Sequence, residues 1–185
     1  SAEEMLQEIE ARRGQGARGI KLHPAAQRFH PSDHRLWPVY GRAQELGWPV
    51  IFHSGAFALG PASSADARLQ NFPEMLAAFP RLCVVLGHMG FGDFQTCAAL
   101  AGDFPNAMFD CCYVINGTPS PEGPSLSDEA AAAAIRSAGA DRVMFGSDYP
   151  WFDPALDAAR ISRLPLPEAE KRAVLYDNAA RVFGV

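Results

Sequence analysis

The feature that most constrains the fold of this chain is a series of five short apolar runs separated by stretches with helical periodicity. The runs occupy residues 16–24, 48–55, 81–90, 106–114 and 142–151. Several of them are almost continuously apolar, which is typical of strands in a parallel sheet whose faces are covered by helices. A first helix followed by five strand–helix units predicts an α/β architecture of parallel strands.

The segments between the runs carry the matching helical signals. Helices are expected over residues 2–13, 35–47, 66–80, 91–104 and 127–139, and from Asp153 and Pro167 onward. Ser32 or Asp33 is the expected N-cap of the second helix, and Gly47 is expected to end it. Pro73 is expected in a first helical turn. The length of 185 residues suffices for a sizeable core, so we expect a single domain over residues 1–185.

Charge and cysteine content exclude several classes of protein. The formal net charge of −5 argues against a nucleic-acid or anionic-membrane partner. No apolar run approaches the roughly 18 residues of a membrane span, and the acidic start SAEEMLQEIE is unlike a signal peptide. The four cysteines lack the CxxC spacing and are expected to be buried free thiols. We therefore expect a cytoplasmic protein that acts on a small molecule.

Ionisable side chains stand at the carboxyl ends of most of the predicted strands. His53, His88 and Asp148 each follow an apolar run and precede a Gly or Pro turn. Asp110 lies near the end of the fourth run. Because the carboxyl ends of parallel strands meet at one rim, where barrel enzymes have their active sites, the repetition favours a shared site over isolated structural residues.

Histidine and carboxylate side chains are ligand types that hold zinc or another divalent transition metal. Such a metal would lower the pKa of a bound water to about 7 and polarise a substrate carbonyl. Lys21 and His23 are two apart on the first predicted strand and therefore share a face. Asp148 by itself fits two interpretations equally, a cap of the following helix or a residue with a chemical role. The adjacent Trp151 fits either a substrate wall or core packing.

The runs GIKLHP, PVIFHSG, VVLGHMG and RVMFGSDYP, together with the terminal DNAARVFG, resemble the amidohydrolase-related family. This family is the second amidohydrolase group of the metal-dependent hydrolase superfamily. The match runs in order from about residue 16 to the end of the chain. The resemblance implies a TIM-type (β/α)₈ barrel with a catalytic divalent metal, most often zinc, with manganese as the alternative.

Carried over by position, the resemblance implies a role for each of these residues. His53 resembles a metal ligand, and His88 resembles the histidine that contacts the metal-bound water or the substrate. Asp148 resembles the aspartate that both ligates the metal and takes the proton of the water. Lys21 and His23 fall where related enzymes place substrate-binding groups. Together with Trp151, which would form a wall of the substrate site, these residues make up the predicted site.

The sequence departs from the family pattern at one point. The family carries a His-x-His pair of metal ligands on its first strand, and no such pair occurs in this chain. The five runs therefore correspond to strands 4 to 8, and the chain is expected to be the C-terminal part of a barrel that normally needs about 250 residues. Such a sheet would have open edges, so we expect a homo-oligomer or pairing through those edges.

Three functions are consistent with the sequence. The leading prediction is a metal-dependent hydrolase that opens an amide, ester or lactone bond with a metal-activated water, Asp148 acting as general base and His88 stabilising the developing oxyanion. The same site would also suit non-oxidative decarboxylation of an aromatic or related carboxylic acid. In the third interpretation the chain is a non-catalytic barrel fragment that assembles with another chain. The metal content of the purified chain distinguishes the two enzyme functions from the non-catalytic fragment.

Overall fold

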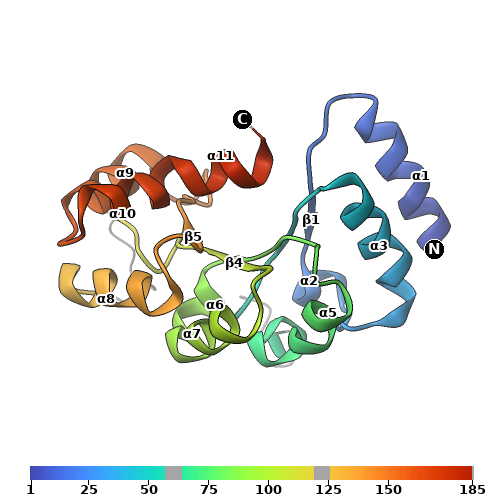
Figure 1. The fold of residues 1–185 in the computed structure, drawn as a ribbon, viewed down its shortest axis with the longest axis horizontal. Coiled ribbons are helices and arrows are strands. Elements are labelled where there is room, and N and C mark those ends of the chain that lie inside the picture. Colours follow the sequence, from blue (N-terminus) through green and yellow to red (C-terminus); the bar gives the residue numbers. More distant parts are fainter. Residues whose placement is uncertain (57–63, 119–125, 185) are drawn as a thin grey trace.

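A computed structural model describes residues 1–56, 64–118 and 126–184 and confirms the α/β architecture (Figure 1). Five parallel strands form one sheet, in which their order β1-β2-β3-β4-β5 is also their order in the chain. The strands are β1 (Ile20–Leu22), β2 (Val50–Phe52), β3 (Val84–Leu86), β4 (Ala107–Asp110) and β5 (Val143–Met144). Each is shorter than its predicted run.

Helices follow the strands as the periodicity predicted. The α-helices are α1 (Ala2–Arg13), α2 (Pro24–Gln27), α3 (Trp37–Leu46), α5 (Pro73–Ala78), α6 (Met89–Gly92), α7 (Phe94–Asp103), α8 (Asp128–Ala138), α9 (Pro154–Arg163), α10 (Glu168–Arg172) and α11 (Asn178–Phe183). Short 3₁₀ turns are η1 (His34–Leu36), η2 (Ala65–Ala67) and η3 (Leu69–Asn71), and η4 (Ala173–Asp177) is a π-helical turn. The predicted helix over residues 66–80 is therefore divided into η2, η3 and α5.

The helix-end signals in the sequence are confirmed with one refinement. Asp33 rather than Ser32 is the cap: its carboxylate accepts the backbone N–H of Arg35 at the start of η1. Gly47 ends α3 in the left-handed conformation, and Pro73 lies in the first turn of α5. The helix expected from Asp153 begins there, since the Asp153 carboxylate accepts the N–H of Ala155.

The two faces of the sheet are covered differently. On the outer face, the registered row Phe52, Leu86 and Phe109 is fully buried under the helices. On the inner face, Val85, Met108 and Met144 form a smaller cluster that is covered by Val182 and Phe183 of α11. The last helix thus packs across the inner side of the sheet. Near the end of α11, the guanidinium of Arg18 donates a hydrogen bond of 3.1 Å to the backbone carbonyl of Gly184.

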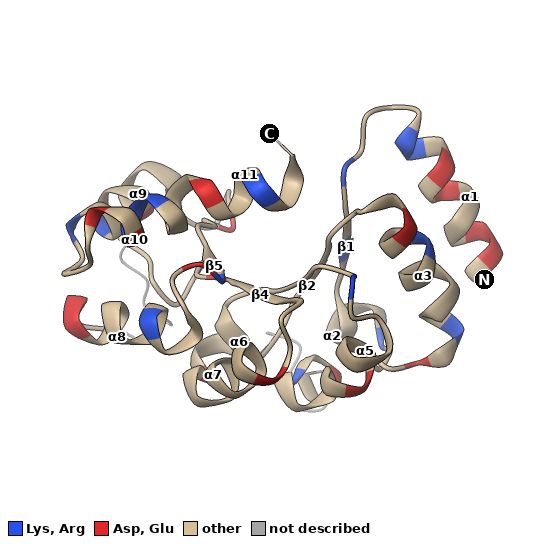
Figure 2. Ribbon diagram, in the orientation of Figure 1, with Lys and Arg blue, Asp and Glu red and all other residues tan. Residues whose placement is uncertain are grey.

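The outer helices carry charged residues of both signs (Figure 2). One ion pair joins α1 to α3, with 2.6 Å between Arg42 Nη2 and Glu10 Oε1. Exposed pairs of this kind contribute little to stability, so the fold depends on the apolar layers. None of the helices in the described ranges is both long enough and apolar enough to cross a membrane.

The cysteines are free thiols, as the sequence predicted. Cys97, Cys111 and Cys112 are buried and Cys83 is half-buried. Burial raises the pKa of Cys83 to about 11 and that of Cys97 to about 12, so both thiols stay protonated near neutral pH.

The edge strands of the sheet lead to a prediction about assembly. In the described part of the chain, β1 pairs only with β2 and β5 pairs only with β4. Unpaired strand edges favour association with another chain. We expect light scattering on the purified chain to give a mass of at least twice 20.0 kDa at high concentration. A mass of one chain at every concentration would contradict this expectation.

Candidate metal centre

Polar side chains from successive strands meet at the carboxyl edge of the sheet, as predicted. His23 directly follows β1, His53 directly follows β2, and His88 comes two residues after β3. Asp110 ends β4, and Asp148 lies beyond the end of β5. The strands are parallel and paired in register, which brings these chain segments to one rim.

His53 and His88 face each other at this rim. His53 Nδ1 lies 3.0 Å from His88 Nε2, and the two rings meet edge to face with centroids 4.8 Å apart. Both side chains are buried. The pKa of His53 is lowered to about 3, mainly by burial and further by the neighbouring His88 and His23. His53 is therefore neutral near pH 7, and neutral imidazole is the form that binds metals.

His23 lies against this pair but also has a structural role. Its ring stacks on His53 with centroids 3.9 Å apart and an interplanar angle of 10°. Its Nδ1 accepts the backbone N–H of Ala26 at 3.2 Å and so caps α2. Burial and the positive charge of Lys21 lower the pKa of His23, and the carboxylate of Asp148 acts in the opposite direction. The structure thus places Lys21 and His23 at the rim; their substrate-binding role stays a prediction.

Asp148 is not a helix cap, because α9 is capped by Asp153. It is exposed and has a left-handed backbone with φ of 56°. Its negative charge contributes to the pKa values of His23 and Cys112, which places it on the same rim. Trp151 is 80% exposed, so the core-packing interpretation of that residue is wrong. Its role as a substrate wall stays a prediction.

His88 is held by an unusual turn that the sequence pattern did not reveal. His88, Met89 and Phe91 have φ values of 59°, 43° and 64°, so the segment labelled α6 is a left-handed turn, and the expected helix begins only at Phe94. Left-handed backbone costs a residue with a side chain about 1–2 kcal/mol. Residues kept in such conformations cluster at functional sites, where the surrounding structure enforces them.

The loop after β2 enforces this turn. The Ser54 hydroxyl donates to the carbonyl of Gly87 at 2.5 Å and accepts the N–H of Gly90 at 3.2 Å. Gly55 packs so closely that a Cβ atom there would lie 2.5 Å from the carbonyl carbon of Gly90. The loop that carries His53 therefore also fixes the direction of the His88 ring.

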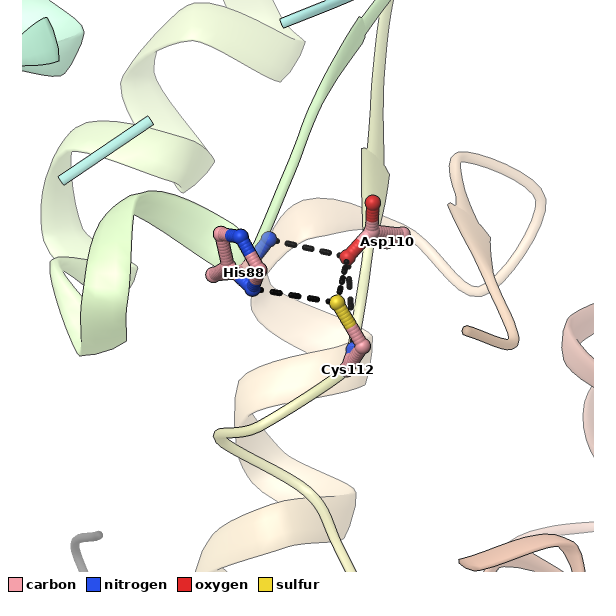
Figure 3. A group of neighbouring side chains, drawn as sticks. All are labelled: His88, Asp110 and Cys112. Carbon is pink, nitrogen blue, oxygen red and sulfur yellow. Dashed lines mark hydrogen bonds between the residues drawn. The ribbon is translucent and has the colours of Figure 1, made fainter. Parts of the chain in front are cut away.

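Asp110 and Cys112 support His88 from the other side (Figure 3). The Asp110 carboxylate accepts the backbone N–H of His88 at 2.8 Å and that of Cys112 at 3.3 Å. Cys112 Sγ lies 2.8 Å from Asp110 Oδ1 and 3.0 Å from His88 Nδ1. Burial and the charge of Asp110 raise the pKa of the Cys112 thiol, which keeps its proton.

The sequence placed Asp110 near the end of the fourth run, and the structure shows it in a hydrogen-bonding role. Cys112 was missed altogether. Its signal is the Asp-x-Cys spacing, because residues two apart at the end of a strand share a face.

Aromatic side chains adjoin the histidines. Phe91 stacks on Tyr113 with centroids 4.2 Å apart and an angle of 25°, and Tyr113 meets Phe152 edge to face at 5.5 Å. The Phe91 ring centroid lies 6.3 Å from that of His88. Sequence reasoning missed this group, because Phe91 and Tyr113 both occupy left-handed positions where no periodic pattern applies.

The geometry of the histidine pair fits a metal ion. Two nitrogens bound to one tetrahedral metal at about 2.0–2.1 Å lie about 3.3 Å apart. The 3.0 Å between His53 Nδ1 and His88 Nε2 is within a few tenths of an ångström of this spacing. Two imidazoles with a carboxylate nearby form a donor set that suits zinc or manganese. The residues present therefore fit a divalent cation.

Comparison with known proteins gives one family. The sequence profile of the family described as amidohydrolase matches residues 1–185. A search of curated proteins finds no match.

Several solved structures are similar. A TIM-barrel protein of uncharacterised function from Bordetella bronchiseptica has 26% identity and a TM-score of 0.83, with 100% of this chain and 63% of that protein covered. The 5-carboxyvanillate decarboxylase of Sphingomonas paucimobilis has 20% identity and a TM-score of 0.67, with coverage of 100% and 62%. A dihydroxybenzoic acid decarboxylase from a Polaromonas species, with bound manganese and 2-nitroresorcinol, has 17% identity and a TM-score of 0.58, with coverage of 84% and 55%.

These similarities define the fold. Five parallel strand–helix units that superpose on TIM barrels are a partial (β/α)₈ barrel, as the sequence predicted. The chain spans less than two thirds of the length of each of these three proteins.

Proposed function

Because the chain belongs to the amidohydrolase family, we propose that it provides the metal-binding edge of a hydrolase that opens an amide, ester or lactone bond of a small molecule. The observation that carries this proposal is the pair of facing nitrogens of His53 and His88 at the rim that Asp148 shares. A divalent metal bound there, zinc or manganese, would acidify a water molecule and polarise the substrate carbonyl.

Each residue of the proposed site has its own role in the reaction. His53 and His88 hold the metal, and their burial limits the access of water from the side of the core. Asp148 is exposed at the rim, where its carboxylate completes the ligand set and takes the proton that water loses on attacking the carbonyl. Lys21 is exposed on β1 and supplies a positive charge for an anionic group of the substrate.

Non-oxidative decarboxylation of an aromatic acid is the second candidate, and one observation favours it. The stacked rings of Phe91 and Tyr113 adjoin His88, and Tyr149 and Trp151 are exposed beside Asp148. Flat aromatic surfaces of this kind suit a planar substrate. In this reaction Asp148 would deliver a proton to the ring carbon that loses carbon dioxide. Release of carbon dioxide from aromatic acids, compared with hydrolysis of esters and lactones, distinguishes the two candidates.

Replacement of Asp148 tests the proposed site. We expect the wild-type chain to retain zinc or manganese after dialysis and Asp148→Asn to bind the metal at least about tenfold more weakly, because the amide lacks the negative charge that attracts the cation. Metal content by mass spectrometry and titration with Zn²⁺ alone measure both quantities.

Asp153→Asn is the matched control for this experiment. Asp153 lies five residues away and caps α9, so its replacement is expected to leave metal affinity unchanged. A wild-type chain that retains no metal, or an Asp148→Asn chain that binds Zn²⁺ as tightly as the wild type, would contradict the proposed function.

A further inference from the structure

The thiol of Cys112 has one proton and two close neighbours. Its sulfur lies 2.8 Å from Asp110 Oδ1 and 3.0 Å from His88 Nδ1. A carboxylate can only accept hydrogen bonds, so the thiol proton points to Asp110. The sulfur is then an acceptor toward His88, and the hydrogen bond between them requires a proton on His88 Nδ1. The unprotonated nitrogen of His88 is therefore Nε2.

The same reasoning applies to the other ring. His53 Nε2 lies 3.0 Å from the backbone carbonyl of Ala56, and a carbonyl oxygen also only accepts. His53 Nε2 therefore carries the proton, and the lone pair of this neutral ring is on Nδ1. This nitrogen is the one that faces His88 Nε2 at 3.0 Å.

Two nitrogen lone pairs thus face each other in a buried site. A divalent metal is the cation that two neutral imidazoles hold through facing nitrogens of this kind. We propose that Asp110 and Cys112 are positioning residues that fix the tautomer of His88 and so present its Nε2, together with His53 Nδ1, to a divalent metal. This inference rests on the proposed metal site. Asp110, Cys112 and His88 form a hydrogen-bonded relay, in which the thiol lies between the carboxylate and the imidazole ring.

The alternative tautomer leaves a conflict in the structure. If His88 Nε2 carried the proton and donated it to His53, His88 Nδ1 would have to accept the Cys112 proton. The sulfur would then turn lone pairs toward Asp110 Oδ1 at 2.8 Å, with no proton between two acceptors. In the first arrangement the contact without a proton is the one between His53 and His88, which a cation can occupy. In the second it is the one between Cys112 and Asp110.

His88, Asp110 and Cys112 also have the composition of a metal site, with one ligand atom of each lying within 4.8 Å of the others. Two observations favour the relay. A sulfur and a nitrogen on one tetrahedral zinc ion lie about 3.5 Å apart, whereas the distance here is 3.0 Å, that of a hydrogen bond. In addition, Asp110 Oδ1 already accepts two backbone N–H groups. We infer that the cation site lies on the His53 side of His88.

The tautomer can be measured directly in the metal-free wild-type chain. Long-range ¹H–¹⁵N spectra of the histidine rings distinguish a protonated from an unprotonated ring nitrogen, and the loss of one set of signals in His88→Gln assigns them. We expect a protonated Nδ1 and a bare Nε2 on His88 at neutral pH. A proton on His88 Nε2 would overturn the inference, and this measurement needs no variant of the relay itself.

Variants of Cys112 test the consequence for metal binding. Cys112→Ala removes the acceptor of His88 Nδ1, so we expect the tautomer to shift toward Nε2–H and Zn²⁺ affinity to fall by about 10–100-fold, as for other residues that orient metal ligands. Cys112→Ser retains a group that both donates and accepts, and it is expected to restore most of the affinity. Cys97→Ala removes a buried thiol of α7 outside the relay and is expected to bind Zn²⁺ like the wild type.

The two measurements separate this inference from the proposed function. Unchanged Zn²⁺ affinity and an unchanged His88 tautomer in Cys112→Ala would overturn the relay while leaving the metal site in place. The expected tautomer in a chain that binds no metal would overturn the proposed function and support the orientation of His88 by Cys112 and Asp110.

Discussion

His53→Ala is expected to abolish stoichiometric binding of zinc or manganese. The substitution removes one of the two facing nitrogens, and His88 and Asp148 are too few ligands to hold the cation without it. The stabilisation of the fold by metal should disappear with it. A ligand present at 100 times its dissociation constant stabilises a protein by about 2.7 kcal/mol, and this increment would be lost in the variant.

Metal content by mass spectrometry and thermal unfolding with and without Zn²⁺ measure this effect. His34→Ala is the matched control, because His34 is exposed and contacts Glu74 at 3.3 Å, away from the rim. The control is expected to retain metal and the Zn²⁺-induced stabilisation. Equal metal content in His53→Ala and wild type would show that the cation binds elsewhere.

Gly55→Ala is expected to cause a large loss of stability. Gly55 has φ of +92°, and a Cβ atom there would lie 2.5 Å from the carbonyl carbon of Gly90 and from Phe91 Cβ. The first contact is with backbone, so no side-chain rotation relieves it. Strained backbone and a forced shift of the left-handed turn together should lower the free energy of unfolding by about 3 kcal/mol or more.

Urea unfolding measures this loss as a lower midpoint at an unchanged slope. Gly102→Ala in α7 is the control, because a Cβ atom there meets nothing within 4 Å. Alanine in an exposed helix is about 1 kcal/mol more favourable than glycine, so this variant should be as stable as the wild type or more so. If Gly55→Ala unfolded at the wild-type midpoint, the close contact with the turn would not be a constraint on the fold.

Much of the candidate site could be read from the sequence, because its members sit at the ends of recognisable strands. His53, His88 and Asp148 each follow an apolar run, and parallel strands bring such ends to one rim. The position of these residues is therefore confirmed, whereas their roles as ligands and base stay predictions. Trp151 shows the limit of this reasoning: its pattern fitted a core residue and a rim residue equally, and only its exposure decided between them.

The residues that orient the site could not be predicted in the same way. Cys112 is an unremarkable apolar residue in the sequence pattern, and its contact with His88 crosses 24 positions of the chain. The left-handed turn at Met89 and Phe91 contradicts the local preference of both residues. It exists because Ser54 and Gly55, on the preceding strand–loop unit, hold it from outside.

The sequence by itself determined the order of strands and helices, the end of a helix at Gly47 and the start of another at Asp153, and the edge of the sheet at which the polar residues lie. These depend on periodicity and on contacts between residues a few positions apart. The tertiary structure alone decided which ring nitrogen of His88 faces His53 and which thiol stands behind it. Those choices depend on the register of β2, β3 and β4 and on hydrogen bonds between strand ends that are 22 to 35 residues apart. The periodicity of neighbouring residues carries no information about contacts between atoms so far apart in the chain.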